Sequence, residues 1–145
     1  MDALLGTPSV RLFGLTYLLL VLKMVAVGWY TSFVRIRKGV YATSEDYAFQ
    51  GLLPASGPDE EIERARRAHR NDLENILPYF GVGLLYALTA PSLTAARIFF
   101  IGYTSARVLH SVFYLAQMQP YRTIVFLIAQ LLMLLMLLST LLTLL

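Results

Sequence analysis

The stretch from Tyr121 to Leu145 reads YRTIVFLIAQLLMLLMLLSTLLTLL, and Arg122 is the one charged residue within it. A helix that crosses a lipid bilayer needs about 20 consecutive, mostly apolar residues. This stretch meets that requirement, so we predict a membrane-spanning helix at 121–145. The chain is therefore expected to be an integral membrane protein.

The composition of the whole chain agrees with this expectation. Of its 145 residues 57% are hydrophobic, and the mean hydropathy is +0.62, which is too apolar for an ordinary soluble domain. There is no cysteine, which excludes disulfides, thiolate metal sites and a cysteine nucleophile. The net charge of +3 is modest, and basic residues are not interleaved with exposed aromatic ones. We therefore expect membrane lipid, and no nucleic acid, as a partner.

Three further apolar segments precede the last span. The polar segment 39–62 separates the first two and is expected to be a surface loop that leads into an acidic helix start. Pro91 marks a tight turn after the second segment, and Pro120 ends the third. The sequence thus predicts a single membrane domain, 1–145, that folds as an all-α, four-helix antiparallel bundle. Its spans are expected at about 10–34, 64–90, 93–117 and 121–145.

Charges near the ends of these spans predict the orientation. The loop at 89–95 carries no charge, whereas basic residues cluster on both sides of the 39–62 loop and at the start of the last span. Positive charge near short loops marks the cytoplasmic side. We therefore predict a cytoplasmic 39–62 loop and both termini on the far side. The basic residues are Arg35, Arg37, Lys38, Arg64, Arg66, Arg67, Arg70 and Arg122.

Two opposite charges lie at similar depth inside the predicted spans. Lys23 is eleven residues from Val34, and Asp72 is eight residues from Arg64. An ionised group in lipid costs roughly 2.5 to 3.5 kcal/mol on insertion scales, so it normally faces a partner inside the bundle. We predict that Lys23 and Asp72 form an ion pair with a structural role.

Polar residues also form stripes at helical spacing. Arg67, Arg70, Asn71 and Glu74 share one face of the second span, at i, i+3, i+4 and i+7. The alternative is a solvated first turn held by ion pairs such as Arg70 with Glu74. Two further stripes comprise Arg107, His110 and Tyr114 on the third span and Arg122, Thr123, Phe126 and Gln130 on the fourth.

These stripes favour a small anionic ligand. Guanidinium groups bind carboxylates, and Glu74 can accept a hydrogen bond from an ammonium group. Glutathione carries both groups, and an arginine beside its sulfur would favour the thiolate. For His110 the alternative is a hydrogen bond between helices. No metal site is predicted, because the two histidines lie on different helices without a carboxylate pair at ligand spacing.

Four segments of the chain carry a distinctive sequence, namely ERARRAHRNDLENILP at 63–78, VRIRK at 34–38 with Glu45 and Asp46, ARVLHSVFYL at 106–115 and QPYR at 119–122. Together they resemble one known family, the membrane-associated proteins in eicosanoid and glutathione metabolism (MAPEG). Members of that family are homotrimers of four-helix subunits that bind glutathione between neighbours, and they include glutathione transferases and prostaglandin E synthases. The resemblance implies the same assembly and ligand here.

The resemblance also implies roles for individual residues. Arg122 would stabilise the thiolate, Asp46 stands where the synthases have a proposed proton carrier, and Thr123 replaces a serine. Phe126 departs from the synthases, whose tyrosine contacts the ligand, and the transferase branch tolerates phenylalanine. The expected glutathione contacts are Arg35, Arg70, Asn71, Glu74, His110, Tyr114 and Arg122, with Arg67 and Arg107 in support and Phe126 and Gln130 in the same binding site.

The leading hypothesis is a membrane-bound glutathione transferase, with peroxidase activity as an extension. Its thiolate would attack a lipophilic electrophile or a lipid hydroperoxide. The first alternative is a glutathione-dependent prostaglandin E synthase, and the second is a non-catalytic binding or transport module. A eukaryotic source would place the protein in the endoplasmic reticulum membrane, and a bacterial source in the inner membrane.

Overall fold

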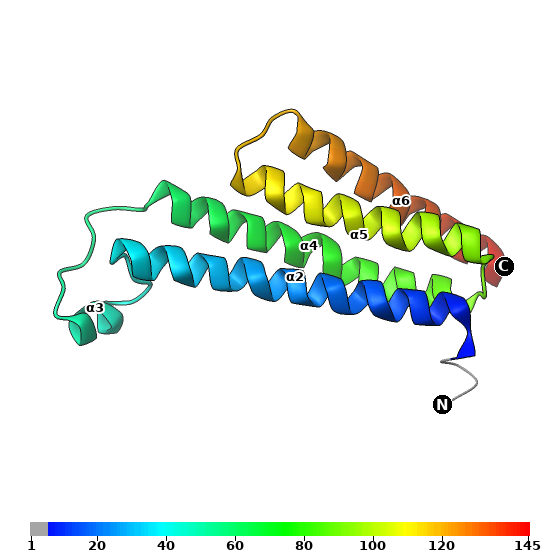
Figure 1. Cartoon of the computed structure of the whole chain (residues 1–145), viewed down its shortest axis with the longest axis horizontal. Helices are drawn as coiled ribbons and strands as arrows, with labels where there is room; N and C mark the ends of the chain where they lie inside the picture. Colours follow the sequence, from blue (N-terminus) through cyan, green and yellow to red (C-terminus); the bar gives the residue numbers. More distant parts are fainter. Residues whose placement is uncertain (1–5) are drawn as a thin grey trace.

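The computed structural model describes residues 6–145, and within them every regular element is a helix. Four long helices lie side by side and alternate in direction, which makes an antiparallel bundle (Figure 1). Helices α4 and α5 contact each other and both remaining long helices, whereas α2 and α6 do not touch. The helices are α2 (Pro8–Lys38), α3 (Ser44–Gln50), α4 (Glu60–Leu88), α5 (Leu93–Leu115) and α6 (Tyr121–Leu144).

Helices α2, α5 and α6 are each long and apolar enough to cross a membrane. The expected all-α membrane fold is therefore confirmed. Helix α4, with 29 residues, is also long enough to cross a membrane. Among the described helices it does not count as an apolar span, because it carries too many charged residues. That α4 also crosses the membrane stays a prediction.

The helix ends follow local capping. Asp59 precedes α4, and its carboxylate accepts hydrogen bonds from the backbone N–H groups of Glu61 and Ile62. Gly39 ends α2 with a φ of 64°, a left-handed conformation that glycine adopts without steric cost. Helix α2 therefore runs four residues beyond the expected span, and the basic cluster at 35–38 lies in its last turn.

The prediction of a plain surface loop at 39–62 was wrong in one part, because α3 forms within it. The Thr43 hydroxyl accepts a hydrogen bond from the backbone N–H of Asp46, and Gly51 ends the helix with a φ of 65°. Glu45 and Asp46 lie in its first turn, where negative charge is favourable. Both end signals are present in the sequence, but the seven residues between them are too few to show a periodic pattern.

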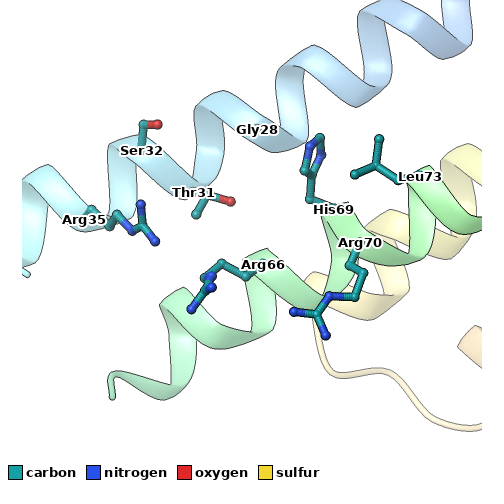
Figure 2. A pocket seen from close by; sticks show the side chains of 8 residues that line it. All are labelled: Gly28, Thr31, Ser32, Arg35, Arg66, His69, Arg70 and Leu73. Atoms are coloured by element: carbon teal, nitrogen blue, oxygen red, sulfur yellow. The ribbon is translucent and has the colours of Figure 1, made fainter. Parts of the chain in front are cut away.

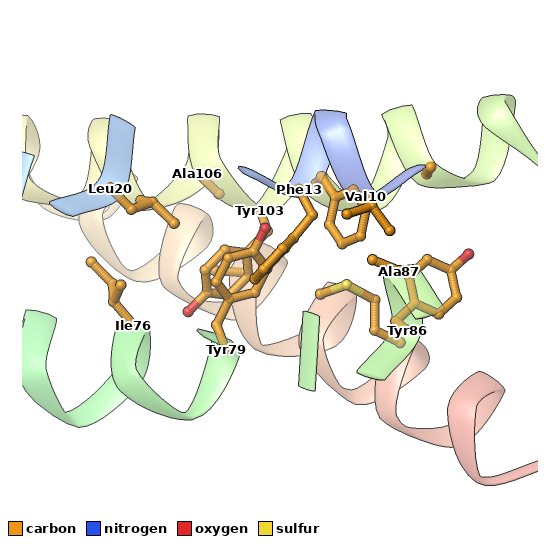
Figure 3. Close-up of a cluster of buried hydrophobic side chains, with 13 residues drawn as sticks. Val10, Phe13, Leu20, Ile76, Tyr79, Tyr86, Ala87, Tyr103 and Ala106 are labelled. Atoms are coloured by element: carbon orange, nitrogen blue, oxygen red, sulfur yellow. The ribbon is translucent and has the colours of Figure 1, made fainter. Parts of the chain in front are cut away.

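Aromatic side chains fill the middle of the bundle. The rings of Tyr79 and Tyr103 stack with their centroids 4.0 Å apart, and Phe13 packs against Tyr79 (Figure 3). Phe13 also packs against Phe100 on α5. Gly83 lets α2 approach α4 closely, because a Cβ there would lie 2.7 Å from the Phe13 ring. This aromatic cluster joins α2, α4 and α5.

Pro78 lies inside α4, one residue before the aromatic cluster begins on that helix. Proline has no backbone N–H, so the carbonyl of Glu74 lacks the hydrogen bond that a helix normally supplies from four residues ahead. The helix nevertheless continues to Leu88. Its hydrogen-bond ladder therefore has a missing bond between the charged half and the aromatic half.

The predicted pairing of Lys23 with Asp72 is confirmed. The Lys23 ammonium binds Asp72 Oδ1, and Arg107 Nη2 donates to the same oxygen at 3.1 Å. The side chains of Asp72 and Arg107 are fully buried, and the Ser111 hydroxyl lies 3.4 Å from Asp72 Oδ1. One carboxylate therefore ties α2 and α5 to α4.

We expect Asp72→Asn to destabilise the bundle by about 3–5 kcal/mol, because it leaves two buried cations without their counter-charge. The unfolding temperature in detergent would fall accordingly. Glu63→Gln is the control, since it removes only the exposed pair with Arg66. An Asp72→Asn protein as stable as this control would contradict the structural role of Asp72.

A second ion-pair cluster holds together the two ends of the 39–59 connection, beyond the predicted spans at 10–34 and 64–90. Lys38 Nζ lies 2.9 Å from both Asp59 Oδ2 and Glu61 Oε2. Hydrogen bonds from Lys38 lower the pKa of Asp59 below its usual 3.8 and that of Glu61 below its usual 4.5. The same bonds raise the pKa of Lys38 above 10.5. The Lys38 ammonium and the carboxylates of Asp59 and Glu61 are therefore all charged at neutral pH.

The depressed carboxyl pKa values predict how this cluster responds to acid. Its stabilisation is complete above the usual values of 3.8 and 4.5 and is lost as the pH falls through the lower folded-state values. Below about pH 4 we expect faster hydrogen exchange in residues 39–59, after correction for the intrinsic rate. Lys38→Met should show the faster exchange already at neutral pH. If wild type and Lys38→Met respond to acid alike, the cluster does not hold the connection.

Candidate functional site

One pocket lies between α4, α5 and α6, and we call it the α4–α6 pocket. The Arg122 guanidinium lies over the Tyr114 ring, 4.6 Å from its centroid. The His110 ring centroid is 5.7 Å from that of Tyr114 and 5.8 Å from that of Phe126. The pocket has a volume of about 240 Å³ and is lined by Asn71, His110, Tyr114, Arg122, Thr123 and Phe126. All six were predicted as site residues.

Within the part of the chain that the structure describes, Arg122 forms no ion pair with a carboxylate. Its neighbour Gln119, with the amide oxygen facing Arg122, accepts a hydrogen bond from Nε at 3.1 Å and donates one to Thr123 at 3.0 Å. Gln119 thus holds the guanidinium at the pocket without neutralising it. A half-buried cation of this kind favours an anionic ligand.

A second pocket lies between α2 and α4, and we call it the α2–α4 pocket. It contains two predicted residues, Arg35 and Arg70. In Figure 2 the guanidinium groups of Arg35 and Arg66 face the space between the helices, whereas that of Arg70 extends away from α2. The pocket has a volume of about 380 Å³ and is lined by Gly28, Thr31, Ser32, Arg35, Arg66, His69, Arg70 and Leu73.

An apolar groove continues from the α2–α4 pocket towards the middle of the bundle. Gly28 and His69 line both, and Trp29, Leu77 and Phe80 are among the side chains that line the groove alone. Its volume is about 530 Å³. Arginine side chains and an apolar surface therefore meet on one side of α4.

Three other predicted residues lie outside both pockets. Arg107 is fully buried beneath the α4–α6 pocket and is bound to Asp72 and Asn71. Gln130 donates a hydrogen bond to the side chain of Asn75, so it joins α6 to α4. Arg67 is exposed, bound to Glu60 at 2.8 Å, and interacts electrostatically with Tyr114.

The last two predicted residues are exposed. Glu74 forms no ion pair within residues 6–145, and the alternative of an Arg70–Glu74 pair is not observed there. Asp46 belongs to α3, which Figure 1 places on the opposite side of the bundle from the α5–α6 connection. Asp46 and Arg122 are therefore separated within one chain.

The two pockets share no lining residue. The face on which Arg67, Arg70, Asn71 and Glu74 were expected to act together is thus divided, with Arg70 and Asn71 in different pockets. The sequence analysis did not assign to a binding site five further residues that lie at these pockets, namely Thr31, Ser32, Arg66, His69 and Gln119. Their signal was weak, because each needs the position of a neighbouring helix to be recognised.

Comparison with known proteins reveals a clear relationship. Prostaglandin E synthase of Equus caballus is 37% identical over 130 residues, which cover 89% of this chain and 85% of the horse protein. Microsomal glutathione S-transferase 1 of Rattus norvegicus is 42% identical over 109 residues, which cover 72% of this chain and 70% of the rat protein. The Bos taurus transferase is 41% identical over 111 residues, or 73% of this chain and 72% of the bovine protein.

The family assignment rests on a match of similar length. Residues 13–142 match the MAPEG family, and this range contains α4 and α5 entirely and most of α2 and α6. The four segments that resembled this family at the level of sequence all fall within that range. The chain therefore belongs to the MAPEG family.

Proposed function

We propose that the protein is a membrane-bound glutathione transferase, and one observation carries the proposal. Arg122 lies at the α4–α6 pocket as a cation without a carboxylate partner in the described chain, among the polar side chains of Asn71, His110, Tyr114 and Thr123. This set of donors fits an anionic peptide. The transferases among the relatives, at 41–42% identity, support the same assignment.

Arg122 would act on the sulfur of glutathione. A guanidinium beside a thiol stabilises the thiolate and lowers the thiol pKa. In conjugation the thiolate forms a bond to the electrophilic carbon, and the leaving group departs with its electron pair. With a hydroperoxide, the thiolate sulfur bonds to the terminal oxygen and the O–O bond breaks, so the sulfur becomes a sulfenic acid and the departing alkoxide takes up a proton from water to leave as the alcohol. The thiol of a second glutathione then attacks the sulfenic sulfur, which yields the disulfide and releases the oxygen as water. Thr123 and Tyr114 supply hydroxyl groups beside the reacting atoms.

The division of the predicted ligands between two pockets supports a site shared between subunits. Arg35 and Arg70 line the α2–α4 pocket, whereas Asn71, His110 and Arg122 line the α4–α6 pocket. In a cyclic homotrimer, the α2 side of one copy can meet the α6 side of the next. Glutathione would then bind both sets of residues. The same contact would bring Asp46 of one copy to Arg122 of another, as its proposed role in proton transfer requires.

The apolar groove next to Arg35 and Arg70 supports a lipophilic second substrate. Its lining by Trp29, Leu77 and Phe80 suits an apolar molecule that arrives from the bilayer. We infer that α4 crosses the membrane with the other three helices, because its buried Asp72 is neutralised by internal ion pairs. The 39–62 loop then faces the cytoplasm, in the endoplasmic reticulum of a eukaryote or the inner membrane of a bacterium.

The alternative function is prostaglandin E synthesis, and the horse synthase, which matches 89% of this chain, specifically favours it. That reaction would isomerise an endoperoxide and return glutathione unchanged. Phe126 at the α4–α6 pocket is the residue that favours the transferase instead.

Arg122→Ala should abolish the ultraviolet absorption of bound thiolate at neutral pH and lower the rate of conjugation of chlorodinitrobenzene about a hundredfold or more. Arg97→Ala is the control, because Arg97 lies near the start of α5, at the other end of the bundle (Figure 1). Turnover of an endoperoxide without any conjugation would instead support the synthase. A wild-type protein that binds no thiolate would overturn both enzymatic assignments.

Mixing two inactive variants tests the shared site. Arg35→Ala and Arg122→Ala each lack one half of the proposed site, and random trimers of the two would carry about one quarter intact sites. Co-expression should therefore recover about a quarter of the wild-type activity at limiting glutathione. If the co-expressed protein is no more active than the two variants purified separately and then combined, the site lies within one subunit.

A further inference from the structure

The buried guanidinium of Arg107 contacts Asn71 directly. Its Nη2 donates to the side-chain oxygen of Asn71 at 2.7 Å, and the Asn71 backbone carbonyl lies 3.3 Å from the same nitrogen. A guanidinium carries donors alone and keeps its proton in proteins. The end of the Asn71 amide that faces Arg107 must therefore be the oxygen.

Asn71 lines the α4–α6 pocket, and its amide oxygen is already bound to Arg107, so the opposite end of the amide is the one left for a ligand there. Among residues 6–145 the Asn71 Nδ2 group has no hydrogen-bond partner, and it is not one of the fully buried atoms that lack one. It is thus available to a ligand, and it can only donate. Together with Arg122, it makes this part of the pocket a set of donors.

Two further hydrogen bonds hold this part of α4 in place. The Asn75 side chain donates to the Asn71 backbone carbonyl at 2.7 Å, and Gln130 on α6 donates to the Asn75 side chain. The backbone at Asn71 is therefore held from α6 as well as from α5. What Arg107 adds is the direction of the amide.

The buried charges next to Asn71 are also unbalanced, with more positive than negative charge. Two cations, Lys23 and Arg107, share the single carboxylate of Asp72. One positive charge is left over, and Arg107 Nε and Nη1 are buried without a partner in the described chain. This excess charge beneath the pocket also favours an anionic group on the ligand.

We propose that Arg107 is a positioning residue that makes the pocket select a carboxylate of glutathione over a carboxamide. It does so by holding the Asn71 amide with its oxygen inward and its N–H donors outward. This proposal rests on the glutathione site proposed above. It assigns Arg107 no contact with the ligand.

Substitution of Asn71 gives the first test. Asn71→Ala removes one donor and should weaken glutathione binding about tenfold. Asn71→Asp should weaken it further, about a hundredfold, because an oxygen then faces the ligand carboxylate. The Asn71→Asp substitution also adds a carboxylate beside the buried Arg107 guanidinium, so the unfolding temperature of this variant should not fall below that of wild type. Tighter binding by Asn71→Asp than by Asn71→Ala would overturn the proposal.

Substitution of Arg107 gives the second test, with two glutathione amides as probes, one modified at each carboxylate. Wild type should bind one of the two amides at least about tenfold more weakly than glutathione, and we call the ratio of these two dissociation constants the amide ratio. Arg107→Lys, which still carries donors alone, should keep this ratio. Arg107→Gln can accept a hydrogen bond and lets Asn71 turn over, so the ratio should fall about fivefold or more. Equal ratios in Arg107→Lys and Arg107→Gln would overturn the proposal.

Ser111→Ala is the matched control, because Ser111 contacts Asp72 but not Asn71. It should leave the amide ratio unchanged, and a change as large as that of Arg107→Gln would show a general effect of the buried network and overturn the positioning role. Failure of the proposed function would look different, since wild type would then bind no glutathione. The thiolate absorbance at saturating glutathione should persist in both Arg107 variants, because Arg122 is untouched.

Discussion

The bundle depends on a single buried carboxylate. Asp72 is fully buried and binds both Lys23 and Arg107, so it connects α4 to α2 and α5 at one depth. Removal of one member would leave another charge unpaired in the interior, which is far more costly than a lost surface contact. Apolar side chains tolerate small sliding movements between helices, whereas this ion-pair network does not. The axial positions of three helices are therefore set together.

The same ion-pair network also fixes the positions of residues at the candidate site. Arg107 donates hydrogen bonds both to Asp72 in the network and to Asn71 at the pocket. The hydrogen bond from Gln130 to Asn75 connects α6 to the same part of α4. The stability of the fold and the direction of donors at the site thus share residues. Because α2 and α6 do not touch, the bundle also leaves different surfaces on the two sides of α4.

The sequence was sufficient to predict the features that depend on one helix or on charge in lipid. The four long helices and the pairing of Lys23 with Asp72 came from length, spacing and the cost of buried charge. The assignment of Arg122 to the site came from the resemblance to the MAPEG family. The short helix α3 was missed, because its order comes from end caps and not from periodicity. The separation of Arg70 from Asn71 was also missed, since helical spacing places residues on a face but does not show which neighbour covers each side. The contact of Arg107 with Asn71 needed the packing of α4 against α5.

Pro78 makes the stiffness of α4 uneven along its length. On one side of it, α4 is held by the ion pairs of Asp72, and on the other by the stacked rings of Tyr79 and Tyr103. The missing backbone hydrogen bond lies between these two anchors, and bending of a helix concentrates where its ladder is interrupted. We therefore expect α4 to bend at Pro78 and not within either half. A displacement of its polar end would then change the angle at Pro78 and leave the aromatic cluster in place.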